Sequence, residues 1–163
     1  MDDFLIPLQV VKQGYRVIYE PLARAFEKPA GSVFGEFKRK VRIGASNFST
    51  IAEFRSLLHP KRGFISFILW SHKMIRWFVP FLIILFLISG ALLSSYNAFY
   101  TIIFMGSILF FSIGLVGLIF EIMHIPIGIF GLPYYFLAMN SALLMGFSRF
   151  LFGRQKTTWD VIR

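Results

Sequence analysis

The sequence predicts a chain in two parts, a small α+β region at the front and an α-helical membrane region behind it. The composition is 56% hydrophobic and only 15% charged, whereas about a quarter of the residues in ordinary soluble domains are charged. The charges are also unevenly placed. Residues 1–76 hold 13 Lys/Arg and 6 Asp/Glu, residues 77–148 hold only Glu121, and residues 149–163 hold four basic residues and Asp160. Lipid is therefore the expected solvent for the back half.

Three apolar runs, at 78–95, 98–121 and 129–148, predict three membrane-spanning helices. About 20 apolar residues are needed to cross the hydrocarbon core of a bilayer. The polar turn at 94–97 separates the first two runs, and Glu121 closes the second. The third run contains glycine, proline and asparagine, which membrane helices tolerate when neighbouring helices satisfy the backbone.

Residues 61–77 alternate aromatic with basic and polar side chains, which predicts an amphipathic helix lying in the membrane interface. The excess of basic residues before the first run places residues 1–77 on the cytoplasmic side of the cell membrane. Three crossings would put the basic tail, 149–163, on the outside, while its four basic residues favour the inside. Both placements of the tail stay open.

The front half reads as mixed α and β structure. Residues 3–13 have helical apolar spacing and end at Gly14. The β-branched and aromatic residues at 15–19 predict a strand, with a possible second strand at 22–27. A second helix is expected after Ser32, a good N-cap residue. Because roughly 60 residues bury too little surface to close an α/β core, this region is expected to be a piece of a larger domain.

The composition limits which metals, lipids or nucleic acids the chain is expected to bind. The chain has no cysteine and three histidines without metal-ligand spacing, so we expect no metal site in it. The sequence pI is about 10.2, but the basic residues stand beside membrane segments. Anionic membrane lipid is therefore the expected partner, and nucleic acid is not.

Several motifs resemble those of membrane-bound family 2 glycosyltransferases. Asp-Asp-Phe with Pro-Leu over 2–8, Gly-Tyr-Arg-Val-Ile-Tyr-Glu-Pro over 14–21 and Arg-Lys-Val-Arg-Ile-Gly over 39–44 are similar to the C-terminal third of that catalytic domain. Trp-Ser-His-Lys over 70–73 resembles the interface helix of the family, and Gly-Arg-Gln over 153–155 resembles the end of such chains. The resemblance implies that residues 1–60 are an α+β remnant of a glycosyltransferase A-type α/β domain.

The resemblance also implies an activity, the inverting transfer of a sugar from a nucleotide-diphosphate sugar to a saccharide or lipid-linked acceptor. In this scheme Asp3 is the general base that accepts the proton of the acceptor hydroxyl. Asp2, Arg39 and Arg42 would bind substrate, with Arg42 countering charge on the leaving diphosphate. Arg39 replaces the glutamine of the family motif, and Ile43 replaces its tryptophan. The second change favours single-sugar transfer over processive synthesis.

The nucleotide-binding half of the family, with the Asp-x-Asp that holds Mg²⁺ or Mn²⁺, has no counterpart in the sequence. The chain is therefore expected to be a C-terminal fragment that is inactive alone and holds no cofactor. A non-catalytic alternative remains, a small membrane scaffold with a basic lipid-binding face. In that case Asp2 and Asp3 only stabilise a helix N-terminus, and the basic run 38–42 is a solvated or lipid-contacting face.

Overall fold

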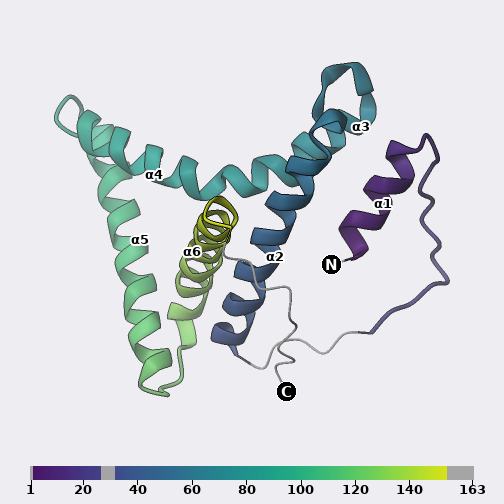
Figure 1. Cartoon of the computed structure of the whole chain (residues 1–163). Coiled ribbons are helices and arrows are strands. Elements are labelled where there is room, and N and C mark those ends of the chain that lie inside the picture. Colours follow the sequence, from purple (N-terminus) through teal and green to yellow (C-terminus); the bar gives the residue numbers. More distant parts are fainter. Residues whose placement is uncertain (1, 27–31, 154–163) are drawn as a thin grey trace. The chain divides into compact units, whose positions relative to one another are not determined.

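The computed structural model describes residues 2–26 and 32–153, except for the side chains of Asp2 and Asp3, and all its regular elements in these residues are helices (Figure 1). The α-helices are α1 (Asp2–Lys12), α2 (Val33–Glu53), α3 (Phe64–Ile68), α4 (Ile75–Leu93), α5 (Ala98–Ile122) and α6 (Gly131–Leu151). The 3-10 turns are η1 (Arg55–Leu58), η2 (Pro60–Arg62) and η4 (Gly128–Phe130), and η3 (Leu69–Met74) is a π-helical turn.

The chain divides into two compact units. One combines Met1–Arg76 with Leu143–Arg163, and the other is Trp77–Ala142. The predicted front half and the end of α6 therefore belong to one unit, and most of the apolar helices belong to the other. Residues 154–163, which contain most of the predicted basic tail, lie outside the described residues.

The predicted strands at 15–19 and 22–27 are wrong for the residues that the structure describes, because 15–26 contain no strand. Residue 27 lies outside those residues. A strand needs a neighbouring strand to pair its backbone groups, and this segment has none in the structure. Its apolar side chains are exposed instead, with Ile18 at 85% and Phe26 at 94%. The segment 15–26 therefore has the composition of a strand, but no other element that the structure describes packs on its apolar side chains.

Both helices predicted in the front half are confirmed. The first, α1, ends as expected at Gly14, whose φ of 90° permits the left-handed turn. There the Tyr15 N–H donates to the Val10 carbonyl over 3.1 Å. The second, α2, begins after Ser32, whose hydroxyl accepts from the Gly35 N–H over 3.0 Å.

The end of α6 packs against α2, as Figure 1 shows. The contact is close because small residues face each other: a Cβ added to Gly44 would lie 3.6 Å from the Cα of Gly146. One turn along, the ring of Phe48 lies 5.1 Å from that of Phe147 and 6.0 Å from that of Phe150. Glycines thus let the backbones approach, and aromatic rings fill the space beside them.

Three helical stretches, Phe64–Leu93, Ala98–Ile122 and Gly128–Leu151, are long and apolar enough to cross a membrane. They match the three predicted runs and are compatible with a multi-pass membrane protein. One boundary differs, since residues 64–77 of the interface helix predicted at 61–77 run without a break into the first span. No glycine or proline lies between 64 and 79 to end the helix.

Within the second unit, α5 packs closely on the start of α6. A Cβ added to Gly114 would lie 3.0 Å from the carbonyl oxygen of Pro133, and one added to Gly117 would lie 2.7 Å from the Cβ of Tyr134. The ring of Phe120 lies 5.2 Å from that of Phe130 at the end of this contact. Close backbone approach at small residues is typical of helix packing in membranes.

Candidate functional site

Helix α1 is held in the first unit near both of its ends. The Lys12 ammonium lies 5.1 Å from the ring centre of Phe54, and the Lys73 ammonium lies 4.7 Å from that of Phe4. Between them Leu8 is buried. Cation–π contacts of this kind contribute about 0.5–1 kcal/mol each at exposed sites. The last turn of α1 thus contacts the residue that ends α2, and its first turn contacts η3.

The first turn of α1 carries two predicted site residues, Asp3 as the general base and Asp2 as a substrate-binding residue. Asp2 and Asp3 precede Phe4 in this turn, and their side chains lie outside the described part of the chain. A helix N-terminus favours the ionised carboxylate, because the helix dipole is positive there. The contact between Phe4 and Lys73 places this turn beside η3, directly before α4.

The segment η3 is a π-helical turn within the first apolar stretch. The N–H of Ile75 donates to the carbonyl of Trp70, five residues back. Such turns are rare and occur frequently at functional sites. In this turn the Ser71 hydroxyl donates to the Phe67 carbonyl over 2.8 Å and lies 2.8 Å from Nδ1 of His72.

The start of the same stretch is tied to the preceding turns through one carbonyl group. The buried Ser66 hydroxyl donates to the carbonyl oxygen of Leu58 over 2.7 Å. Trp70 Nε1–H donates to the same oxygen over 3.2 Å. A carbonyl oxygen has two lone pairs and can accept both bonds.

On α2 the basic run is organised around Glu36. Arg39 Nε donates to one carboxylate oxygen of Glu36 over 2.8 Å and Nη2 donates to the other over 3.0 Å. Lys40 lies 3.7 Å from the same carboxylate. The hydrogen bond from Arg39, helped by the charges of Arg39 and Lys40, lowers the pKa of Glu36 below its ordinary value despite some opposing desolvation.

The basic run on α2 also contains Lys38 and Arg42, which differ in exposure. Lys38 is exposed and its ammonium lies 4.4 Å from the ring centre of Phe34. Arg42 is half-buried on α2. The predicted phosphate-binding residues Arg39 and Arg42 therefore share one helix, and any anion at Arg39 would compete with Glu36.

Sequence reasoning missed two of these relationships. Glu36 stands three residues before Arg39 and four before Lys40, a spacing at which helical side chains meet, so the ion pairs could have been read from the sequence. The contact of Lys73 with Phe4 has no such local signal, because the two residues are far apart in the chain. Only the tertiary structure brings them together.

Among the described residues, no group of three or more His, Cys, Asp or Glu side chains could hold a metal ion. The resemblance places the Mg²⁺ or Mn²⁺ in the nucleotide-binding half of the family and not in the residues of this chain.

Comparison with known proteins finds no match, whether the chain is compared with protein-family models, curated proteins or solved structures.

Proposed function

We propose that the chain is the membrane-bound acceptor side of an inverting glycosyltransferase that uses a nucleotide-diphosphate sugar. Its acceptor is a saccharide or a lipid-linked glycan, in envelope or exported glycan synthesis. The proposal rests on the ordered motifs at 2–8, 14–21 and 39–44. The nucleotide-binding half of the proposed enzyme, with its divalent metal, lies in a part that these motifs do not cover.

In the proposed reaction the acceptor oxygen attacks the anomeric carbon of the donor sugar, and the bond from that carbon to the diphosphate oxygen breaks. Asp3 accepts the proton of the acceptor hydroxyl. Arg42 lies near the leaving diphosphate and stabilises the negative charge that grows on it. Asp2 and Arg39 help to bind the substrates, and Ile43 in place of an aromatic platform favours the transfer of one sugar.

The observation that carries the proposal is the contact between Phe4 and Lys73, 4.7 Å from ring centre to ammonium. It holds the turn that contains Asp3 beside the π turn at Leu69–Met74. This turn belongs to the first helical stretch that is apolar enough to cross a membrane. A base in this position suits an acceptor that is presented at the membrane surface.

The exposed segment at 15–26 supports the idea of a larger catalytic domain. Its apolar residues are uncovered in the structure: Tyr15, Val17, Ile18, Tyr19, Leu22 and Phe26. Exposed apolar surface of this extent is typical of interaction sites. We propose that the rest of an α/β sheet covers this segment in the assembled enzyme, and that the segment forms part of that domain there.

In this proposal the enzyme resides in the cell membrane with residues 1–77 on the cytoplasmic side, where nucleotide sugars are available. The basic residues at the start of the first span support this side, since Arg55, Lys61 and Arg62 are all exposed.

The test is a transferase assay of the protein in native membranes, together with its natural flanking sequence. Release of nucleoside diphosphate would be followed for a panel of nucleotide sugars. Asp3→Asn is expected to lower the rate by about 10²- to 10⁴-fold, the usual contribution of a general base. Glu53→Gln, an exposed carboxylate at the end of α2, is the matched control and should retain the rate.

Two results would contradict the proposal. Equal rates for Asp3→Asn and Glu53→Gln, with equal expression, would remove Asp3 from the role of base. A lack of nucleoside diphosphate release with every donor sugar would remove the transferase activity itself.

A second candidate function is a non-catalytic membrane scaffold that binds anionic lipid headgroups. It is favoured by exposed basic residues before and at the first span: Lys38, Arg55, Lys61, Arg62 and Arg76. Each basic residue near an anionic surface contributes about 1 kcal/mol. Under this hypothesis, protein in detergent transfers to vesicles containing phosphatidylglycerol in preference to pure phosphatidylcholine vesicles. The double variant Lys61→Glu, Arg62→Glu is expected to lose this preference. The wild type is expected to show no transferase activity.

A further inference from the structure

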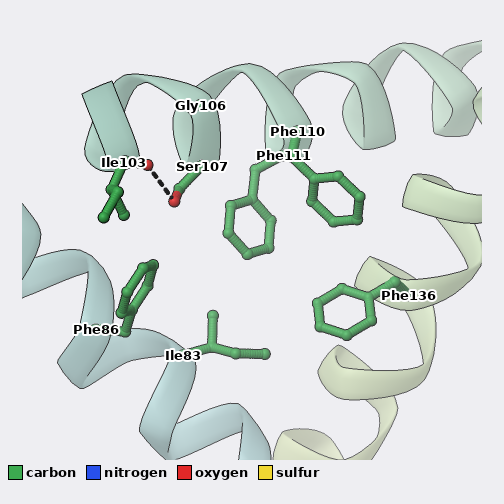
Figure 2. Close-up of a pocket in the computed structure, with 8 residues that line it drawn as sticks. All are labelled: Ile83, Phe86, Ile103, Gly106, Ser107, Phe110, Phe111 and Phe136. Carbon is green, nitrogen blue, oxygen red and sulfur yellow. Dashed lines mark hydrogen bonds between the residues drawn. The ribbon is translucent and has the colours of Figure 1, made fainter. Parts of the chain in front are cut away.

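An open apolar groove of about 390 Å³ lies within the unit Trp77–Ala142. Figure 2 shows its walls: Ile83 and Phe86 come from α4, Phe110 and Phe111 from α5, and Phe136 from α6. Its volume lies within the range of roughly 300–1,000 Å³ that is usual for small-molecule sites.

The lining offers a ligand no free side-chain donor, and the Ser107 oxygen is its one side-chain acceptor. Ser107 is the polar residue among the lining side chains, and its hydroxyl donates to the carbonyl of Ile103 over 2.8 Å (Figure 2). No charged residue lines the groove. A polar or ionic ligand would lose its hydration there and gain at most one hydrogen bond in return, which is unfavourable. The groove therefore suits a hydrocarbon.

The position of the groove along α5 matches the depth of lipid tails. The lining residues Ile103 to Phe111 follow the start of α5 at Ala98, so they lie roughly 8–20 Å along the helix at 1.5 Å per residue. The polar turn 94–97 precedes this helix, and Glu121 lies near its other end. In a bilayer with a hydrocarbon core of about 30 Å, the groove would face acyl chains.

Gly106 keeps the groove open. A Cβ added there would meet nothing within 4 Å, whereas one added to Gly117 of the same helix would lie 2.7 Å from Tyr134. Gly117 thus serves helix packing, and Gly106 leaves space unfilled. A helix is about 10 Å wide with its side chains, so a slender chain enters such a space between aromatic rings more readily than a helix does.

We propose that this groove binds one acyl chain of a membrane lipid, held along α5 between the rings of Phe86, Phe110 and Phe136. The inference rests on the proposed membrane location of α4, α5 and α6 and does not depend on sugar transfer. In a bilayer the chain gains no hydrophobic free energy by entering the groove, because the tails around it are equally apolar. Dispersion contacts with the rings retain it.

The test uses the full chain in nanodiscs of phosphatidylcholine that carries a photoactivatable diazirine in the middle of one acyl chain. After irradiation, adducts are mapped by mass spectrometry. Adducts are expected at Ile83–Phe86 and at Ile103–Ser107. Gly106→Phe, which fills the groove, is expected to lower their yield several-fold. Leu109→Phe, on an exposed and non-lining position of the same helix, should leave the yield unchanged.

A second variant guards against misfolding of the first. Phe136→Ala removes one wall and is expected to raise the yield at Ile83–Phe86. If neither Gly106→Phe nor Phe136→Ala changes the yield, the proposal is overturned, because labelling would then report the outer surface alone. Absent groove adducts in the wild type, together with cross-linked dimers, would also overturn it and make a second copy of the chain the occupant.

Discussion

Gly146 of α6 lies against the backbone of α2, where a Cβ added to it would be 2.9 Å from the carbonyl oxygen of Val41. Real Cβ atoms essentially never come so close to another heavy atom. The nearest atoms belong to the backbone of α2, so no side-chain rotation can relieve the contact. Val41 itself is 1% exposed, and the contact therefore belongs to the core of the first unit.

Replacing Gly146 by leucine is expected to destabilise this unit. Overpacking of this kind costs about 1–3 kcal/mol. The measurement is the denaturant midpoint of unfolding in detergent, followed by circular dichroism. Gly106→Ala is the control, since its Cβ meets open space and alanine favours a helix by up to about 1 kcal/mol over glycine. A midpoint for Gly146→Leu at or above that of wild type would show that α2 and α6 do not pack as described.

Replacing Gly117 by alanine is expected to loosen the packing of α5 on the start of α6. The added methyl group would lie 2.7 Å from the Cβ of Tyr134 and 2.9 Å from the carbonyl oxygen of Phe130. Faster amide hydrogen exchange at 130–136 is the expected readout. Gly131→Ala makes a fair comparison, because a Cβ added there meets only the Ile127 side chain, 3.8 Å away, apart from its chain neighbours and its own helix backbone. Equal exchange in the two variants would argue against the close contact.

Replacing Lys73 by methionine is expected to release the first turn of α1, because the ammonium above Phe4 is lost. The loss is about 0.5–1 kcal/mol. It should appear as faster amide exchange at 4–8, while Lys73→Arg should keep the slow rate. Lys12→Met acts through Phe54 at the other end of the helix, so its effect should concentrate at 9–12. An identical exchange pattern for both methionine variants would contradict this division.

The ion pair between Glu36 and Arg39 predicts a dependence of stability on pH. The pKa of Glu36 in the folded chain lies below its ordinary value of 4.5. Its contribution is therefore fully present above pH 4.5 and is lost as the pH falls through the folded pKa. Ion pairs at this helical spacing contribute about 0.2–0.5 kcal/mol, and this pair is partly buried. Unfolding midpoints between neutral and acidic pH should converge for wild type and Glu36→Gln, and a constant difference would count against the pair.

The two hydrogen bonds to the carbonyl of Leu58 predict non-additive substitutions. Ser66→Ala removes a bond of 2.7 Å and Trp70→Phe one of 3.2 Å. Each single variant leaves the oxygen with the other donor, so each should cost roughly 1 kcal/mol or less. The double variant should cost more than the sum of the two. Strictly additive unfolding free energies in a double-mutant cycle would show that the two donors act independently.

Most of the helices could be predicted from local patterns. Ser32 as N-cap, Gly14 as helix stop and the apolar runs behind residue 78 each act within a few residues, and the structure has helices at all these places. The strand at 15–19 was wrong for a different reason. Its side chains favour a β conformation, but a strand exists only when a second strand accepts its hydrogen bonds, and such a partner is not a local property.

Some contacts of the candidate site could likewise be predicted from local spacing, and others could not. Spacing alone places Glu36 beside Arg39, since residues three apart on a helix are neighbours. Spacing could not place Phe4 beside Lys73, or Gly146 beside Val41, because these contacts join segments distant in the chain. The roles of Asp2, Asp3, Arg39 and Arg42 in sugar transfer stay predictions that the proposed variants test.

The sequence by itself determined which segments are helical and which of them are apolar enough for lipid, because hydropathy and helix capping are properties of neighbouring residues. The tertiary structure alone decided which helices approach closely, where α1 is held and where a groove stays open. Those features depend on glycines and rings meeting across the chain, and a glycine that packs a helix cannot be told from one that leaves a space until the opposing side chains are in place.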